Sequence, residues 1–259
     1  MDREPLCVNA LLAQDEPPPF TVINPAGTSA AVLVCDHASN LVPRGLKGLG
    51  LNAKVLDSHI AWDPGAALVS KLLSNTLDAA LVLSGYSRLV IDCNRPLESP
   101  ESIPENSAGV CISGNQALTL TAKKQRIESL FLPYQHAIAQ LLEQRSRPTV
   151  LISIHSFISE LYGKKRPWQV GVAGYCDHRL ARALYTALRQ TDGLVVGFNQ
   201  PYTIEEKFDY TLPIQGEESG LHCAMVEIRQ DEIANIINAQ NWAKRLANAW
   251  RMAEPVLAI

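Results

Sequence analysis

The stretch AVLVCDHASN, residues 31–40, joins an apolar strand pattern to a pair of chemically reactive side chains. Its first five residues are apolar, which is typical of a strand that is buried on both faces of a parallel sheet. They end abruptly at Asp36 and His37, and small or turn-forming residues follow. A buried strand has no structural need for an acid and an imidazole at its end. We therefore interpret the stretch as a core strand that delivers functional residues.

The chain alternates between such apolar runs and segments with helical spacing. Buried strands are expected within residues 30–37, 79–86, 88–94, 148–157, 168–175, 193–202 and 222–233. Helices are expected within residues 63–77, 120–146, 178–190 and 238–257. This alternation predicts an α/β fold, in which a largely parallel sheet is covered by helices on both faces.

Prolines mark several boundaries in this pattern. The first helix is expected to start near Asp63-Pro64, because proline is favoured in the first turn. Pro133 should bend or interrupt the helix within residues 120–146. Residues 96–117 contain three prolines and two glycines and are expected to form a long loop, which could close over a site. No internal repeat or low-complexity linker appears, so we expect a single domain over residues 1–259.

Composition narrows the class of protein. The chain has 47% hydrophobic and 19% charged residues and a formal net charge of −3, with both signs mixed along it. We find no basic tract that would bind nucleic acid, no apolar run that would span a bilayer, and no signal-peptide pattern at the start. The six cysteines show no CxxC spacing. We expect a cytoplasmic protein with reduced thiols and without nucleic-acid or membrane partners; its oligomeric state is open.

Polar residues recur where four of the predicted strands end. These clusters are Asp36-His37, Asp92-Asn94-Arg95, His155-Ser156 and Glu227-Arg229. In open α/β sheets, ligands bind outside the carboxyl ends of the strands, so a parallel sheet would bring the four clusters to one edge. One histidine at a strand end is more often structural, but two of them near several acids indicate a metal site.

His37 and His155 are the first two candidate ligands, since neutral imidazole is the commonest protein ligand of zinc. A catalytic zinc takes three protein ligands and keeps one open position. Asp63 is the better candidate for the third ligand, although it could instead be the N-cap of the helix that follows. Asn40, three residues after His37, is the weaker alternative because an amide carbonyl is a poor zinc ligand.

Glu227 lies in an apolar strand pattern that would otherwise exclude a carboxylate. Burial of an unpaired carboxylate is costly, so Arg229 or a metal-activated water must compensate it. One interpretation is a structural Glu227–Arg229 pair. The other is a general base that deprotonates the water and passes the proton to a leaving amine.

Arg88 and Arg95 flank the LVIDCN run and point to an anionic substrate. A planar guanidinium binds a carboxylate through two parallel hydrogen bonds. Asn94 would add an amide contact to the same group, and Arg229 is a further candidate for substrate binding. Arginines in such places can also simply be solvated.

Five ordered motifs resemble the N-formylglutamate amidohydrolase family. They are VLVCDHASNLVP (32–43), HIAWDPGA (59–66), SRLVIDCNRP (87–96), ISIHSF (152–157) and VEIRQD (226–231). The resemblance extends over about residues 30–233. That family is similar in fold and site order to the zinc carboxypeptidases and aspartoacylases. It implies a three-layer α/β/α sandwich with a mixed, mostly parallel sheet, of the phosphorylase/hydrolase-like type.

The resemblance also implies roles in a fixed order along the chain: a zinc histidine, an arginine, an Asn-Arg pair for the substrate carboxylate, a second zinc histidine and a catalytic glutamate. The matching residues here are His37, Arg88, Asn94-Arg95, His155 and Glu227. Arg88 would then stabilise the oxyanion, and the cofactor would be Zn²⁺ or another divalent metal.

The implied reaction is hydrolysis of an N-acyl amino acid, such as N-formyl-L-glutamate, by a zinc-activated water. The substrate would be small and anionic. The carboxypeptidase pattern has a glutamate ligand three residues after the first histidine, where this chain has Asn40, so Asp63 takes the third place by inference. The alternatives are a metallo-carboxypeptidase acting on small or cell-wall peptides and a non-catalytic anion-binding homologue.

Overall fold

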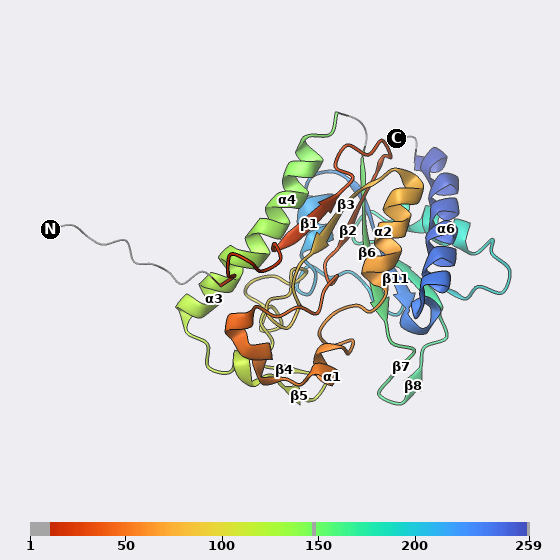
Figure 1. Cartoon of the computed structure of the whole chain (residues 1–259). Coiled ribbons are helices and arrows are strands. Elements are labelled where there is room, and N and C mark those ends of the chain that lie inside the picture. Colours follow the sequence, from red (N-terminus) through yellow and green to blue (C-terminus); the bar gives the residue numbers. More distant parts are fainter. Residues whose placement is uncertain (1–10, 147–148, 258–259) are drawn as a thin grey trace.

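A seven-stranded sheet forms the centre of the computed structural model, which describes residues 11–146 and 149–257 (Figure 1). Its strands, in spatial order, are β1 (Phe20–Ile23), β3 (Ala80–Ser84), β2 (Ala31–Cys35), β6 (Val150–Phe157), β11 (His222–Arg229), β9 (Val170–Ala173) and β10 (Val196–Phe198). The β1–β3 and β11–β9 pairs are antiparallel, and the other four pairs are parallel. The expected mixed, mostly parallel sheet is confirmed.

Helices cover both faces of this sheet, so the fold is a three-layer α/β/α sandwich (Figure 1). The helices are α1 (Ala53–Leu56), α2 (Ala66–Leu77), α3 (Leu120–Arg126), α4 (Leu132–Glu143), α5 (Arg179–Leu188) and α6 (Ile236–Ala253). Helices α2, α5 and α6 pack on the face that carries Leu33 and Ile152. Helix α4 packs through Tyr134 and Ile138 on the opposite face. None of the helices in the described part of the chain combines the length and the apolar character that crossing a bilayer requires.

The three central strands run in the same direction, which decides where the functional residues meet. Strand β6 lies between β2 and β11 and is parallel to both. All residues of β2 and β6 are buried, which explains why most of their residues are apolar. The carboxyl ends of β2, β6 and β11 therefore open onto one edge of the sheet.

The expected strand within residues 88–94 is wrong, because this segment forms turns rather than a strand. Its apolar residues are nevertheless buried, in a separate cluster with Leu130 and Phe131. Side chains take over the backbone hydrogen bonds that a sheet would have made: Arg126 Nη1 donates to the carbonyl of Val90 at 2.8 Å, and Asn115 Nδ2 donates to that of Leu89 at 2.8 Å. An apolar run predicts burial, but it does not distinguish a strand from an irregular segment of the core.

The proline and loop predictions are partly confirmed. A π-helical turn at Ile127–Phe131 separates α3 from α4, directly before Pro133. Residues 96–117 are largely irregular but include a small hairpin of β4 (Asn106–Ser107) and β5 (Val110–Cys111). A second small hairpin, β7 (Glu160–Leu161) with β8 (Lys164–Lys165), and edge strand β1 had no counterpart among the expected elements. The cysteines of the described residues are all free; Cys7 lies outside them.

Candidate active site

Three buried side chains come together at the carboxyl edge of the central strands. His37 follows the last residue of β2 by two positions, His155 lies in β6, and Glu227 lies in β11. Glu227 is paired with His155 in the parallel register of these two strands. All three line a cavity of about 460 Å³. The sheet therefore brings together the two histidines and the glutamate, as the strand-end pattern predicts.

Asp63 joins this group from the turn that precedes α2. Its backbone N–H donates to the carbonyl of His37 at 3.0 Å, which places the two residues side by side. Gly65 then turns the chain into the helix with a φ of +84°, and a Cβ there would lie 2.7 Å from Ile233. The helix consequently begins at Ala66, later than expected, and the Asp63 side chain does not cap it. Instead, Asp63 Oδ2 accepts a hydrogen bond from the backbone N–H of Ser156 at 3.2 Å.

Both imidazoles face Asp63 through the same ring atom. Oδ2 of Asp63 is 2.8 Å from His155 Nδ1 and 3.4 Å from His37 Nδ1. His37, Asp63 and His155 can each offer a ligand atom to one metal ion, with those atoms within 4.8 Å of one another. The set has two imidazoles and one carboxylate, which is the donor set of many catalytic zinc sites.

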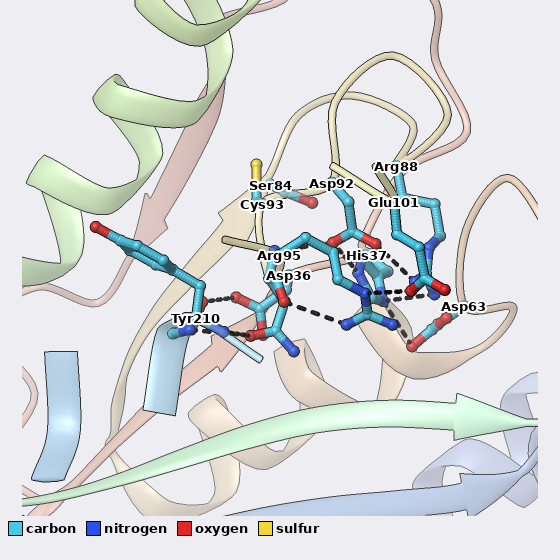
Figure 2. A network of polar contacts seen from close by, with 12 residues as sticks. Asp36, His37, Asp63, Ser84, Arg88, Asp92, Cys93, Arg95, Glu101 and Tyr210 are labelled. Atoms are coloured by element: carbon cyan, nitrogen blue, oxygen red, sulfur yellow. Dashed lines mark hydrogen bonds and ion pairs between the residues drawn. The ribbon is translucent and has the colours of Figure 1, made fainter. Parts of the chain in front are cut away.

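The Nε2 atom of each imidazole contacts a further carboxylate, which differs between the two histidines. His37 Nε2 is 2.8 Å from Asp92 Oδ1, and His155 Nε2 is 3.1 Å from Asp36 Oδ2. Figure 2 shows His37 between Asp92 and Asp63. Metal-binding histidines almost always donate their other N–H to such a partner, which fixes the ring and leaves the free nitrogen toward the metal. This arrangement fits a divalent metal bound through both Nδ1 atoms.

The charges around the histidines also fit a cation. Asp36, Asp63, Asp92 and Glu227 are all buried carboxylates. Burial opposes ionisation of Asp92, but the Arg88 guanidinium at 2.6 Å, together with His37, holds the pKa of Asp92 well below its usual range. The two carboxylates beside His155 outweigh the effect of burial and raise the pKa of that imidazole well above its usual value. Such a concentration of negative charge favours a bound metal ion.

Asn40, the weaker candidate ligand, lies away from this group. Its Nδ2 donates to Asp57 Oδ1 at 2.9 Å in an exposed position, and Asn40 does not line the cavity. The alternative in which Asn40 supplies the third ligand is therefore wrong for this structure.

Glu227 has no partner for one of its carboxylate oxygens. Among the described residues, no group donates to its buried Oε2. Burial raises the pKa of Glu227 to about 7, despite the favourable charge of His155. The alternative of a structural Glu227–Arg229 pair is wrong, because Arg229 turns to Asp231 at 2.7 Å and Glu232 at 3.1 Å. Arg229 is also absent from the lining of the cavity, so its role as a substrate contact stays a prediction that this geometry does not support.

Arg88 and Arg95 reach the cavity from an irregular loop instead of from a strand end. Arg88 Nη1 lies 3.3 Å from His37 Nδ1, and its Nη2 pairs with Asp92. Arg95 donates through Nε to Glu101 Oε2 at 3.2 Å (Figure 2). Its Nη1 donates to the carbonyl of Phe208 at 2.6 Å. Both arginines keep N–H groups that none of these contacts uses.

Asn94 also lines the cavity, but its amide mainly supports the neighbouring segment. Oδ1 accepts hydrogen bonds from the backbone N–H groups of Tyr210 at 3.1 Å and Thr211 at 2.9 Å. Nδ2 donates to Asp209 Oδ1 at 3.0 Å. One N–H of the amide is left for a substrate.

Comparison with known proteins identifies the family of this chain. The model of the N-formylglutamate amidohydrolase family matches residues 29–234, which span the whole set from His37 to Glu227. The chain belongs to this family. No curated protein is similar enough to the chain to count as a match.

Two solved structures show the same fold. A gene product of Agrobacterium tumefaciens is 36% identical, with a TM-score of 0.90 over 96% of this chain and 98% of that one. The N-formylglutamate amidohydrolase of Ralstonia eutropha JMP134 is 19% identical, with a TM-score of 0.61 over 93% of this chain and 98% of that one. Both structures therefore share the sandwich fold of this chain.

Part of the cavity wall of this family member carries no motif. Lining residues outside the five motifs include Glu101, Ile158, Leu161, Tyr202 and Phe208, whereas His59 and Phe157 also line the cavity but lie within two of the motifs. They come from loops and from the ends of strands, where their hydrophobic or charged character is ordinary. The outer carboxylate Asp36 did leave a signal, since an acid directly before a histidine at the end of a buried strand has no packing role.

Proposed function

We propose that this family member is a metal-dependent amide hydrolase that acts on an N-acyl amino acid, with N-formyl-L-glutamate as the first substrate to test. One observation carries the proposal: the His37–Asp63–His155 group and the unpartnered Oε2 of Glu227 lie in the same cavity. A ligand set and a separate buried carboxylate are the two parts that metal-assisted hydrolysis requires.

His37, Asp63 and His155 would hold the metal, with Asp92 and Asp36 orienting the two imidazoles. When bound, a divalent metal supplies a Lewis acid and lowers the pKa of water, so that a nucleophile is available near neutral pH. Arg88, which lies against His37, would donate hydrogen bonds to the oxygen of the amide as negative charge develops there.

Glu227 would move the proton. Its free carboxylate oxygen takes a proton from the attacking water as the new C–O bond forms, and returns it to the amide nitrogen as the C–N bond breaks. The products are a carboxylic acid, which is formate for a formyl group, and the free amino acid. Burial raises the pKa of Glu227 above its usual value, which makes its carboxylate a stronger proton acceptor than an exposed glutamate.

Arg95 would bind the carboxylate of the substrate. It lines the cavity, and its Nη2 is not used by the contacts to Glu101 and Phe208. The substrate carboxylate would add a pair of charge-assisted hydrogen bonds there, with the remaining N–H of Asn94 beside it.

A second candidate is a peptidase that acts on small or cell-wall peptides. The apolar part of the cavity wall, formed by Phe157, Ile158, Leu161 and Tyr202, favours a substrate with a larger apolar group than formyl. The same metal and base would serve both reactions, so a substrate panel distinguishes them. A peptidase would cleave peptides and leave formyl amino acids intact.

The first experiment is elemental analysis of untagged protein purified without chelator. We expect about one zinc per chain, lost in His37→Ala and His155→Ala variants, followed by turnover of N-formyl-L-glutamate in the panel. Protein that contains no metal, and takes up none when zinc is added, would overturn the proposal and favour an anion-binding homologue.

A further inference from the structure

Arg166 is a buried arginine that lies behind the cavity wall, against Phe157 and Tyr202, and the proposed mechanism does not use it. Only 9% of its surface is exposed. Nη1 donates to the hydroxyl of Tyr202 at 2.9 Å, and the guanidinium lies over the rings of Tyr202 and Phe157, at 4.9 and 5.5 Å from their centroids. Both rings line the cavity. Arg166 therefore packs directly behind two residues that a substrate would touch.

Among the described residues, Arg166 differs from Arg88 and Arg95 in that no acidic side chain forms an ion pair with it. Arg88 pairs with Asp92, and Arg95 pairs with Glu101. Among residues 11–146 and 149–257, no carboxylate forms an ion pair with Arg166. A buried charge without a counter-charge is costly, and aromatic faces compensate it only partly. Within the described residues, two aromatic rings and a neutral hydroxyl contact the Arg166 guanidinium, and no ion pair neutralises it.

The backbone around Arg166 is held in place. Its N–H donates to the carbonyl of Ser159 at 2.8 Å, which closes the base of the β7–β8 hairpin. Its carbonyl accepts a hydrogen bond from Arg229 Nη1 at 3.3 Å. The backbone that carries the Arg166 side chain is thus fixed at both its N–H and its carbonyl, which is the support that a binding group needs.

We infer that Arg166 and Tyr202 form a second carboxylate-binding subsite of the cavity. Tyr202 accepts the Nη1–H of Arg166, so its own hydroxyl proton is available for a ligand. A substrate carboxylate would accept that proton in a hydrogen bond and supply the missing charge beside the guanidinium. With Arg95 in the same cavity, each of the two carboxylates of the substrate already proposed would then have its own binding residues. This inference rests on the proposed function, and it adds a residue pair that selects the acidic side chain or the main-chain carboxylate.

The test compares N-formyl-L-glutamate with N-formyl-L-glutamine, which differ by one carboxylate. In Arg166→Met and Tyr202→Phe variants, we expect kcat/KM for the glutamate substrate to fall roughly tenfold or more relative to the glutamine substrate, mainly through KM. Tyr202→Phe keeps the ring that stacks on Arg166, so it removes the hydrogen-bonding group alone. The matched control is Arg189→Met, because Arg189 also stacks on a tyrosine, Tyr185, but lies directly after α5 and outside the cavity. An equal loss for both substrates would mean that Arg166 only supports the wall and would overturn the inference.

A binding measurement separates this inference from the proposed function. Titration calorimetry with glutarate and with its monoamide needs no turnover. We expect the wild-type protein to prefer glutarate, and Arg166→Met to lose that preference while Arg189→Met keeps it. If the wild type cleaves no formyl amino acid but shows this pattern, the proposed reaction fails and the subsite stands. If Arg166→Met binds glutarate as the wild type does, the subsite fails regardless of the reaction.

Discussion

Glu227 of β11 stands beside His155 of β6 in the parallel register of the two central strands. Side chains at paired positions of neighbouring strands project to the same face, so the candidate base and a candidate metal ligand enter one cavity from adjacent backbones. Neither depends on a loop for its position. Each of them can therefore be substituted without moving the other, which makes their separate roles testable.

Replacing Glu227 by glutamine should lower kcat by about 10²- to 10⁴-fold, because the amide cannot accept the proton of the attacking water. The change keeps the size of the side chain, so zinc content should stay at the wild-type value. Steady-state kinetics and elemental analysis of the same preparation measure both quantities. Glu128→Gln, on an exposed turn beside α3, is the control. Turnover near that of the wild type in Glu227→Gln would remove Glu227 from the chemistry.

Substitutions of Asp63 and Asn40 should separate the two candidates for the third ligand. Asp63→Asn should lose most of the zinc affinity, since the carboxylate between the two Nδ1 atoms is replaced by a neutral amide. Asn40→Ala should keep it, because Asn40 is bonded to Asp57. Competition with a fluorescent chelator measures the affinities. Equal affinities in the two variants would contradict the assignment of Asp63.

Asp92→Asn should weaken metal binding about 10- to 100-fold without abolishing it, because an outer carboxylate orients His37 and increases its basicity. The matched control is Asp177→Asn. Asp177 also pairs with an imidazole, His222 Nδ1 at 2.6 Å, but the pair lies outside the cavity. The readout is zinc affinity, with circular dichroism to verify folding. An effect of the same size in both variants would argue against an orienting role.

Zinc should stabilise the folded protein. A ligand that binds only the native state adds RT ln(1 + [L]/Kd), which is about 2.7 kcal/mol at a hundredfold excess over Kd. Thermal unfolding after chelation should therefore occur at a lower temperature, and added zinc should reverse the shift in the wild type but not in His155→Ala. A melting temperature that is insensitive to zinc in the wild type would contradict the presence of a metal site.

Arg126→Met should destabilise the fold by about 2–5 kcal/mol, because several buried acceptors lose a charged donor. The guanidinium donates to the carbonyl of Val90 at 2.8 Å and to Asn115 Oδ1 at 2.7 Å, and so supports the loop that carries Arg88 and Arg95. Urea unfolding measures the change. The exposed Arg251→Met should cost less than about 0.5 kcal/mol. A similarly small cost for Arg126→Met would mean that the loop holds its shape without it.

Much of the fold and half of the site could be predicted from local patterns. Buried parallel strands are rich in apolar residues, so the apolar runs that end near His37, His155 and Glu227 predicted the sheet. The polar residues that end these runs predicted the site at its edge. Pro133 likewise predicted the break between α3 and α4, since proline cannot donate the hydrogen bond that a helix interior needs.

Other features depended on residues that are distant in the sequence. The run at 88–94 has the composition of a strand, but Arg126 and Asn115 satisfy its carbonyls, and no strand forms. Arg229 lies two residues after Glu227 at the end of a predicted strand, as a site residue would. Its guanidinium nevertheless pairs with Asp231 and Glu232 outside the cavity lining.

The sequence by itself determined the α/β sandwich, the succession of strands and helices along the chain, and the residue types at the edge of the sheet. It could do so because burial and backbone propensity leave short-range patterns in the sequence. Only the tertiary structure decided that Asp63 lies between the two imidazoles and that Asp36 and Asp92 contact their other ring nitrogens. It also decided that Arg166 packs on two rings without an ion-pair partner among the described residues. Those relationships depend on the register of the central strands, on the turn at Gly65 and on contacts between residues that lie far apart in the sequence. They depend on which surfaces meet in three dimensions, and no local pattern records that.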